Sequence, residues 1–363
     1  MEELVRRRAA TPCILVMGIM EGWTIGLTIL ASTIISKGIN PFIFVAYSSL
    51  LSSLFLLPSF SFHFTISIVR TEFSLLIRII TLALIGIPIA QNLAYVGLSY
   101  SSPIVACVMA NLIPAISFLL NILLRRSRID LRKVSSRIKI VGSLISIVGA
   151  LSTTFYKGPV ISPQLMTISS PRLFVFMSPN QRWILGCALF AAASLSFAVW
   201  NLVQVETVKL YPDADAMKIA SSYTIIGTLV TVIVAVVMER DLTAWGLNMD
   251  INNLLVIVLT AVFGSVVRNR GQMWCTKLKG PFFVPLFKPL TVPYAIFCGC
   301  YFFPHTFHYG SIVGAVIVGM GYYTVMWGMM KEQGDGEIPR TVFSHKGSSE
   351  DDLKVPLLQK EEV

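Results

Sequence analysis

The stretch KIVGSLISIVGAL, residues 139–151, returns in altered form as SIVGAVIVGMGYY at residues 311–323, with Gly142 over Gly314 and Gly149 over Gly321. A second match sets SSPIVACVMANLIP, residues 101–114, against KGPFFVPLFKPLTVP, residues 279–293, with Pro103 over Pro281. These matches indicate that the chain consists of two related halves. How the halves are oriented depends on the number of membrane crossings in each.

The composition points to a membrane protein. Of 363 residues, 55% are hydrophobic and 13% charged, which is about half the roughly 25% charged residues of a soluble domain. We expect a run of about 20 mainly apolar residues wherever a helix crosses the bilayer. Ten such runs occur, at approximately 13–35, 41–58, 74–97, 102–124, 138–156, 183–203, 216–238, 253–275, 281–303 and 309–329. The sequence therefore predicts an all-α integral membrane protein with ten transmembrane helices.

The charges of the loops predict that the two halves are inverted. Each half is expected to cross the membrane five times. Because this number is odd, the second copy lies in the membrane with the opposite orientation. The loop RRSRIDLRKVSSRIK, residues 125–139, carries seven basic residues, whereas its counterpart FPHTFHY, residues 303–309, carries none. Fourteen Lys and Arg residues lie on the N-terminal face and five on the other, so the positive-inside rule places both termini in the cytoplasm. The net charge of +10 is thereby explained without nucleic acid.

The remaining segments divide the chain. Residues 157–182 form a Pro- and Ser-rich external linker, and the polar end of the chain is expected to be disordered. The expected organisation is a cytoplasmic N-terminus at 1–12, a first five-helix repeat at 13–156, the linker at 157–182, a second repeat at 183–330 and a cytoplasmic tail at 331–363.

Enzyme signatures are missing. No G-x-x-x-x-G-K-[ST] or H-E-x-x-H motif occurs, which excludes the usual nucleotide-driven pumps and zinc proteases. His305 and His308 are interpreted as a solvated turn, not as metal ligands. All six cysteines lie in or at the ends of apolar runs, and no N-x-S/T sequon exists, which argues against a disulfide-rich ectodomain. We expect no catalytic activity, cofactor or metal.

Three charged residues are expected at one depth in the membrane. Counted at about 1.5 Å per residue from the N-terminal face, Glu21 lies roughly 13 Å deep, and Lys288 and Arg268 about 12 Å deep. Charge at this depth is costly unless paired or hydrated. Arg78 and Lys218 are near helix ends and can snorkel, and Arg270 points away from Arg268, because two residues turn a helix by about 200°.

The three charges have two interpretations. They form a site for a solute or proton, or they are an internal ion pair that only holds helices together. Helix breaks favour the site, because Pro285, Pro289 and Pro293 surround Lys288 and free backbone carbonyls. Inverted repeats are also common in secondary transporters, with the solute site near the midplane. Further polar or aromatic candidates at depth are Gln91, Asn92, Tyr95, Trp200, Asn201 and Gln204.

Several strings resemble a known family. KIVGSLISIVGALSTTFYKGP (139–159), VWNLVQVETVKLYP (199–212), ERDLTAW (239–245) and WCTKLKGPFFVPLFKPL (274–290) are similar to the plant walls-are-thin-related transporters, EamA-type members of the drug/metabolite transporter superfamily. The resemblance implies two inverted five-helix EamA repeats, with helices 1, 3, 4, 6, 8 and 9 around a central cavity. By this resemblance the substrate-binding residues are Glu21, Gln91, Asn111, Trp200, Gln204, Arg268 and Lys288.

The resemblance also implies the function. We expect a secondary transporter or facilitator that moves small organic solutes, amino acids foremost, across a plant membrane by alternating access. Auxin or another metabolite as substrate, or a non-transporting membrane scaffold, are the alternatives. The partners are then the solute and the lipid bilayer, with a homodimer left open, and the plasma membrane is favoured over the vacuolar membrane. Glutamates that the family commonly carries after helices 4 and 9 are absent, because this chain reads RRSRID and FFPHTF there.

Overall fold

A computed structural model describes residues 10–57, 73–124, 133–156, 181–211, 216–241, 244–249, 251–279, 283–302 and 309–334. This part of the chain is helical and contains no strand. The first half comprises α2 (Ala10–Ser36), α3 (Pro41–Leu56), α5 (Phe73–Leu84), the π-helix η2 (Ile85–Ile89), α6 (Ala90–Tyr100), α7 (Pro103–Ala110), α8 (Ile113–Leu123) and α9 (Val134–Phe155). The second comprises α10 (Gln181–Leu210), α11 (Ala216–Met238), the 3₁₀-helix η3 (Ala244–Met249), α12 (Ile251–Val262), the π-helix η4 (Phe263–Val267), α13 (Arg268–Lys279), the 3₁₀-helix η5 (Pro285–Leu290), α14 (Thr291–Phe302) and α15 (Tyr309–Gly334).

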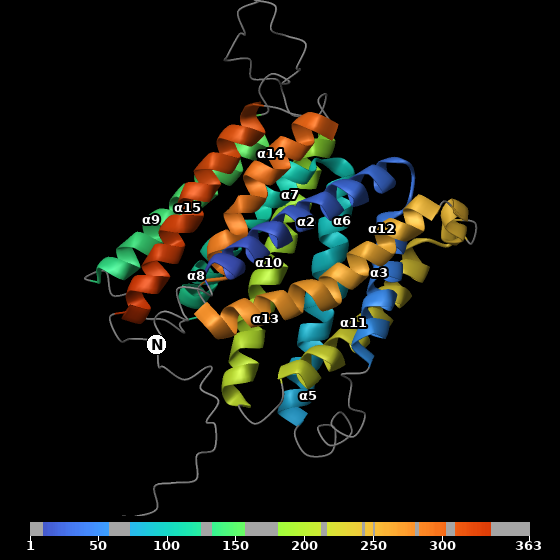
Figure 1. Cartoon of the computed structure of the whole chain (residues 1–363), viewed down its shortest axis with the longest axis horizontal. Helices are drawn as coiled ribbons and strands as arrows, with labels where there is room; N and C mark the ends of the chain where they lie inside the picture. Colours follow the sequence, from blue (N-terminus) through green and yellow to red (C-terminus); the bar gives the residue numbers. More distant parts are fainter. Residues whose placement is uncertain are drawn as a thin grey trace, which may run out of the picture.

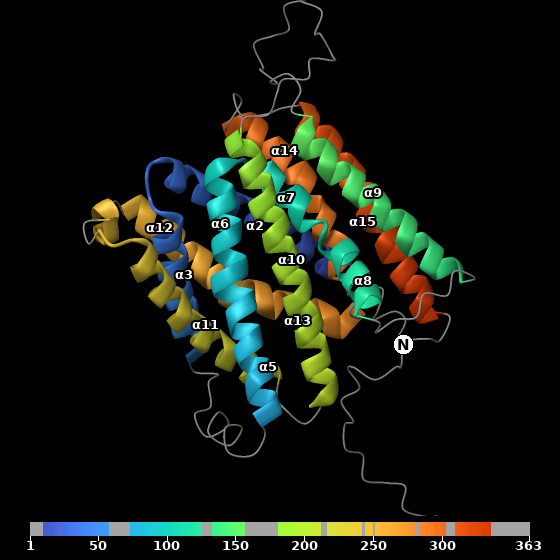
Figure 2. The same ribbon diagram turned by 180° about the vertical axis from the view of Figure 1, so that it is seen from behind.

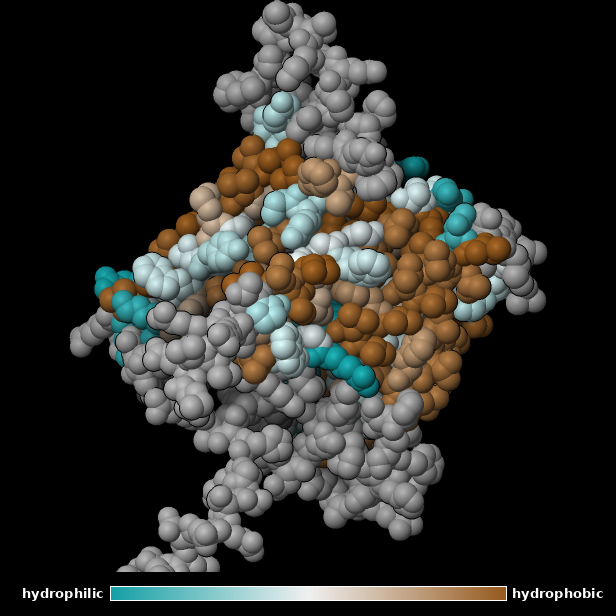
Figure 3. Space-filling model, in the orientation of Figure 1, coloured by the Kyte–Doolittle hydropathy of each residue, from teal (hydrophilic) through white to brown (hydrophobic). Residues whose placement is uncertain are grey.

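Eight helical stretches of the described chain are long and apolar enough to cross a membrane. They correspond to eight of the ten expected spans. At the other two places the structure has α3, a shorter apolar helix of 16 residues, and the consecutive elements η5 and α14. Figure 3 shows a broad hydrophobic surface over the side of the molecule formed by α3 and α12. Such an outer surface suits contact with lipid tails.

The repeated glycines lie where the two halves meet. In Figures 1 and 2, α9 and α15 lie side by side along their length. A Cβ atom on Gly142 would lie 2.7 Å from Val325 N and 2.9 Å from Gly321 O, and one on Gly314 would lie 2.8 Å from Gly149 O. Only glycine allows this approach of the two backbones. The glycines that reveal the repeat therefore join the last helices of the halves.

The helix irregularities repeat as well. The match of Pro103 with Pro281 also sets Gly86 over Gly264, and each of these glycines lies in a π-helix, η2 or η4. The same match sets Asn111, in the break between α7 and α8, over the 3₁₀-helix η5. Since local breaks recur at matching positions, the internal repeat is present in the backbone conformation as well as in the sequence.

The hydrophobic core is uneven along the bundle. One large cluster joins the later part of α2, all of α7, the start of α10 and the start of α15, on the side away from the start of α2. Two smaller clusters, centred on Met17 and on Ile79, lie on the side of that start. In Figures 1 and 2 the upper ends of α6, α10 and α14 lie together, whereas the lower ends of α5 and α15 are far apart. Among the described residues, the largest cluster of buried apolar side chains thus lies on the side away from the start of α2.

Candidate functional site

Glu21 and Lys288, expected at one depth, form an ion pair. Glu21 lies on α2 and is 2% exposed, and its Oε2 is 3.9 Å from Nζ of Lys288, on η5. This separation is too long for a hydrogen bond, and Glu21 Oε2 has no hydrogen-bond partner among the described residues. A quarter of the Lys288 side chain, 26%, remains accessible. The pair is therefore close but open on the lysine side.

Further residues surround this pair. Cys107, a buried residue of α7, lies within electrostatic reach of both Glu21 and Lys288. Arg268, half-buried at the start of α13, lies close enough to Lys288 for the two positive charges to repel each other. The site thus holds two positive charges and one negative charge, contributed by three different helical segments.

Asn111 supplies an unpaired amide. It lies in the break between α7 and α8, is 1% exposed, and neither its Nδ2 nor its Oδ1 has a partner among the described residues. It follows Cys107 by four residues, so both side chains lie on one face of that helical turn. A buried amide without hydrogen bonds is costly, and native proteins normally satisfy it. Asn111 therefore requires a polar partner, such as water or a solute.

Trp200 and its neighbours form a separate group. The indole packs over η2, where a Cβ on Gly86 would lie 2.5 Å from the ring, and meets Tyr223 edge-on at 5.8 Å. Trp200 Nε1 has no partner in the described part of the chain. Gln204, one turn later, and Gln91 on α6 are half-buried. Trp200 thus contacts η2 and α11.

Other charged residues have structural partners. Arg78, expected to snorkel, instead pairs with Glu206 at 3.2 Å. This was missed because the sixth span was expected to end at residue 203, whereas α10 continues to Leu210. Lys139 pairs with Glu332 at 2.7 Å and lies 5.0 Å from the Phe118 ring. The tail was expected to begin at 331, but α15 continues to Gly334 and includes this partner.

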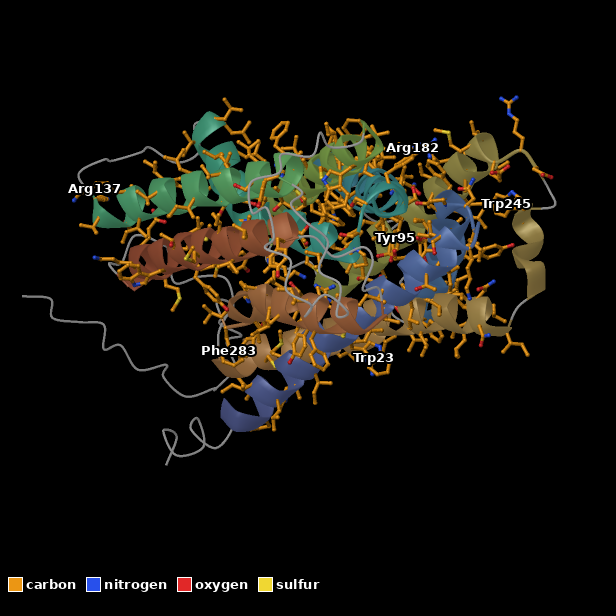
Figure 4. The ribbon with its side chains drawn as sticks, turned by 90° about the horizontal axis from the view of Figure 1, so that it is seen from above. Trp23, Tyr95, Arg137, Arg182, Trp245 and Phe283 are labelled. Atoms are coloured by element: carbon orange, nitrogen blue, oxygen red, sulfur yellow. The ribbon has the colours of Figure 1, made fainter. Side chains whose placement is uncertain are left out.

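The remaining predictions concern the edges of the molecule. Arg270 is exposed, as expected of a helix-end residue. His305, His308 and the side chain of Lys218 lie outside the described residues. Within the described residues, no cluster of three or more His, Cys, Asp or Glu side chains could hold a metal ion. In Figure 4, Arg137 at the start of α9 and Trp245 in η3 lie at opposite edges of the molecule, far from each other.

Two tyrosines near the site were not recognised from the sequence. Tyr322 and Tyr323 of α15 donate hydrogen bonds to the carbonyl oxygens of Pro285 and Leu286, at 2.8 and 3.2 Å. Both acceptors belong to η5, the segment that carries Lys288. The prolines around Lys288 indicated free carbonyls, but the sequence did not indicate which helix would supply the donors.

Comparisons with known proteins agree with this architecture. Residues 12–155 match the EamA-like transporter family. One WAT1-related protein of Arabidopsis thaliana is 43% identical over 375 residues, covering 100% of this chain and 99% of its own, and a second is 40% identical over 359 residues, covering 95% and 94%. A solved crystal structure superposes with a TM-score of 0.51 at 11% identity, covering 89% of this chain and 99% of its own, which supports the fold alone.

The relatives match the chain over nearly its whole length, and the paired helix breaks extend the repeat into the half beyond residue 155. An all-α architecture with many membrane-length helices fits a multi-pass transporter. The chain belongs to the WAT1-related family of EamA-type membrane transporters, within the drug/metabolite transporter superfamily.

Proposed function

We propose that this transporter moves amino acids across the membrane by alternating access. In this proposal the solute carboxylate binds Lys288, with Arg268 nearby, and the solute ammonium group binds Glu21. The single observation that carries the proposal is the Glu21–Lys288 pair, with 3.9 Å between its charged atoms and no hydrogen bond joining them. An amino acid supplies both opposite charges and can replace each partner of the pair with a closer one.

The amide of Asn111 supports the same proposal. Its Nδ2 can donate to a carboxylate and its Oδ1 can accept from an ammonium group, and neither atom has a partner in the described chain. The alternation between a paired and a solute-bound site also avoids leaving a charge uncompensated. Breaking a buried pair without replacement is strongly unfavourable.

A second candidate is an organic anion such as auxin or another carboxylate metabolite. The observation that favours it is Arg268, which lies within electrostatic reach of Lys288 and gives the site two positive charges for one negative. Here Glu21 would remain paired with one cation while the solute takes the other. A non-transporting scaffold is the rival from another class, in which the pair only joins α2 to η5.

The test is flux of radiolabelled amino acids from oocytes that express the chain. We expect Glu21→Gln and Lys288→Ala to lower flux at least ten-fold per molecule at the cell surface. The matched control is Glu332→Gln, which neutralises a similar pair, Lys139–Glu332, located between α9 and α15. Unchanged flux in both site variants would overturn the assignment. If wild-type flux is found only for auxin-like carboxylates, the second candidate is correct.

We also propose that the protein resides in the plasma membrane with both termini in the cytoplasm. The excess of Lys and Arg on the N-terminal face supports the orientation, and the plasma membrane is carried over from the expectation that the family resemblance gives. Epitope tags at each end should be detected only after permeabilisation of protoplasts. Detection without permeabilisation, or a tagged protein found in the vacuolar membrane, would correct this placement.

A further inference from the structure

The segment that carries Lys288 lacks a backbone donor. Pro289, the next residue, has no N–H, so it cannot donate to the carbonyl three residues earlier, as the 3₁₀-helix η5 would require. That carbonyl belongs to Leu286. A missing donor at membrane depth has to be replaced by another polar group.

Two adjacent tyrosines donate to this part of η5. The Tyr323 hydroxyl donates to Leu286 O at 3.2 Å, and the Tyr322 hydroxyl donates to the neighbouring Pro285 O at 2.8 Å. The Tyr323 hydroxyl thus replaces the donor that Pro289 lacks, and the Tyr322 hydroxyl adds a second hydrogen bond beside it. Tyr322 is 3% exposed and Tyr323 is 43% exposed, because neighbouring residues point about 100° apart on a helix. The Tyr322 hydroxyl therefore reaches η5 from the buried side of α15, and the Tyr323 hydroxyl reaches it from the more exposed side.

The tyrosines also connect η5 to the most closely packed helix pair. Tyr322 follows Gly321, and a Cβ on Gly321 would lie 2.6 Å from Ser146 N of α9. The position of α15 against α9 is thereby fixed. On the other side of Lys288, Thr291 Oγ1 donates to the Lys288 carbonyl at 2.8 Å. The backbone of the lysine is consequently held by hydroxyl groups on both sides.

The described part of the first half lacks this arrangement. In the match that sets Gly149 over Gly321, the tyrosines stand over Ala150 and Leu151, whose side chains cannot donate a hydrogen bond. At the corresponding break between α7 and α8, Ser194 of α10 donates instead to Met109 O at 2.7 Å. Among the described residues, the hydroxyl pair thus occurs in the half whose broken helix carries a charged residue.

We propose that Tyr322 and Tyr323 are positioning residues of the solute site: the Tyr323 hydroxyl replaces the backbone donor that Pro289 lacks, the Tyr322 hydroxyl holds the neighbouring carbonyl, and together they keep Lys288 opposite Glu21. The inference rests on the proposed function of that pair. The tyrosines do not need to touch the solute. They determine where the lysine charge stands, and hence the affinity for a solute that binds it.

The test is a double-mutant cycle. Tyr323→Phe keeps the ring and removes the hydroxyl, and we expect it to raise the KM for solute flux about five-fold, the effect of one neutral hydrogen bond, with little change in maximal flux. Pro289→Ala restores an N–H that can donate to Leu286 O. In that background Tyr323→Phe should change the KM less than two-fold. The matched control is Thr324→Val, which removes a hydroxyl of α15 that bonds only within its own helix, to Met320 O.

The result that would overturn the proposal is an unchanged KM in Tyr323→Phe, or an equal rise in the wild-type and Pro289→Ala backgrounds. Thermal stability in detergent provides a readout independent of transport. Tyr323→Phe should lower the Tm by about 2 °C, and it should leave the Tm unchanged in the Pro289→Ala background. If that pattern holds but no solute moves in the wild type, the hydrogen-bond replacement stands and the transport proposal falls. An equal Tm loss in both backgrounds would refute the replacement of the missing donor by Tyr323.

Discussion

Removing one charge of the Glu21–Lys288 pair is expected to destabilise the protein more than removing both. Across 3.9 Å, opposite charges attract by about 4 kcal/mol at an effective dielectric constant of about 20. Because 26% of the Lys288 side chain is accessible, solvent reduces this to about 3 kcal/mol. Lys288→Met leaves the buried Glu21 carboxylate uncompensated and should cost roughly that amount. Adding Glu21→Gln removes the stranded charge and should restore most of it.

The assay is the thermal stability of the purified protein in detergent, read as the monodisperse fraction after heating. At about 2 °C per kcal/mol for a chain of this size, Lys288→Met should lower the Tm by roughly 6 °C. The double variant should return to within about 2 °C of wild type. If the double variant is as unstable as the single one, the two charges are not coupled in the folded protein. The interpretation of Glu21 and Lys288 as an ion pair would then be wrong.

Three further predictions follow from the described contacts. Asn111→Leu should leave the Tm unchanged or raise it, since the amide has no partner in the described chain, yet lower flux at least five-fold; a fall of both quantities would show a structural role. Gly321→Val should prevent the purified protein from eluting as a monodisperse peak in size-exclusion chromatography, because even a Cβ would lie 2.6 Å from Ser146 N; a normal elution profile would contradict the packing of α9 on α15. Arg78→Ala should cost only about 0.5 kcal/mol, because its pair with Glu206 is 24% and 31% exposed; a Tm loss above 4 °C would mean that this pair is stronger than its exposure implies.

Much of the fold could be predicted because membrane helices follow simple rules. Length and apolar composition were enough to locate the long spans, and the rise per residue was enough to place Glu21 and Lys288 at one depth. Gly142 and Gly321 were both visible as repeated glycines, each matched to a different partner, but their mutual contact requires the three-dimensional packing of the halves. Depth can be counted along a helix, whereas the identity of a facing helix cannot.

The helix breaks were only partly predictable. Proline in η2 and η5 gives a local reason for irregular backbone. The π-helix η4 reads FGSVV and contains no proline, so its extra residue per turn has no equally clear signal in the sequence. Its position opposite η2 in the internal match was the available indication.

The candidate site shows the same limit. The charges could be found because an ionisable residue in an apolar run is rare. The donors to the carbonyls of η5 could not, since Tyr322 and Tyr323 look like ordinary aromatic residues of a membrane helix. Asn111 has no hydrogen-bond partner in the described chain. This could not be predicted from a short sequence motif, because it depends on every side chain around the amide.

The most direct test of the central claim is amino-acid flux in proteoliposomes that contain the Glu21→Gln, Lys288→Met double variant, compared with wild type at equal protein content. The two proteins should have nearly equal Tm values, so any difference in flux reports the charges and not the fold. The account predicts at least a ten-fold loss of flux in the double variant, because its site no longer offers opposite charges to an amino acid. Flux at the wild-type rate would contradict the claim that Glu21 and Lys288 bind the solute.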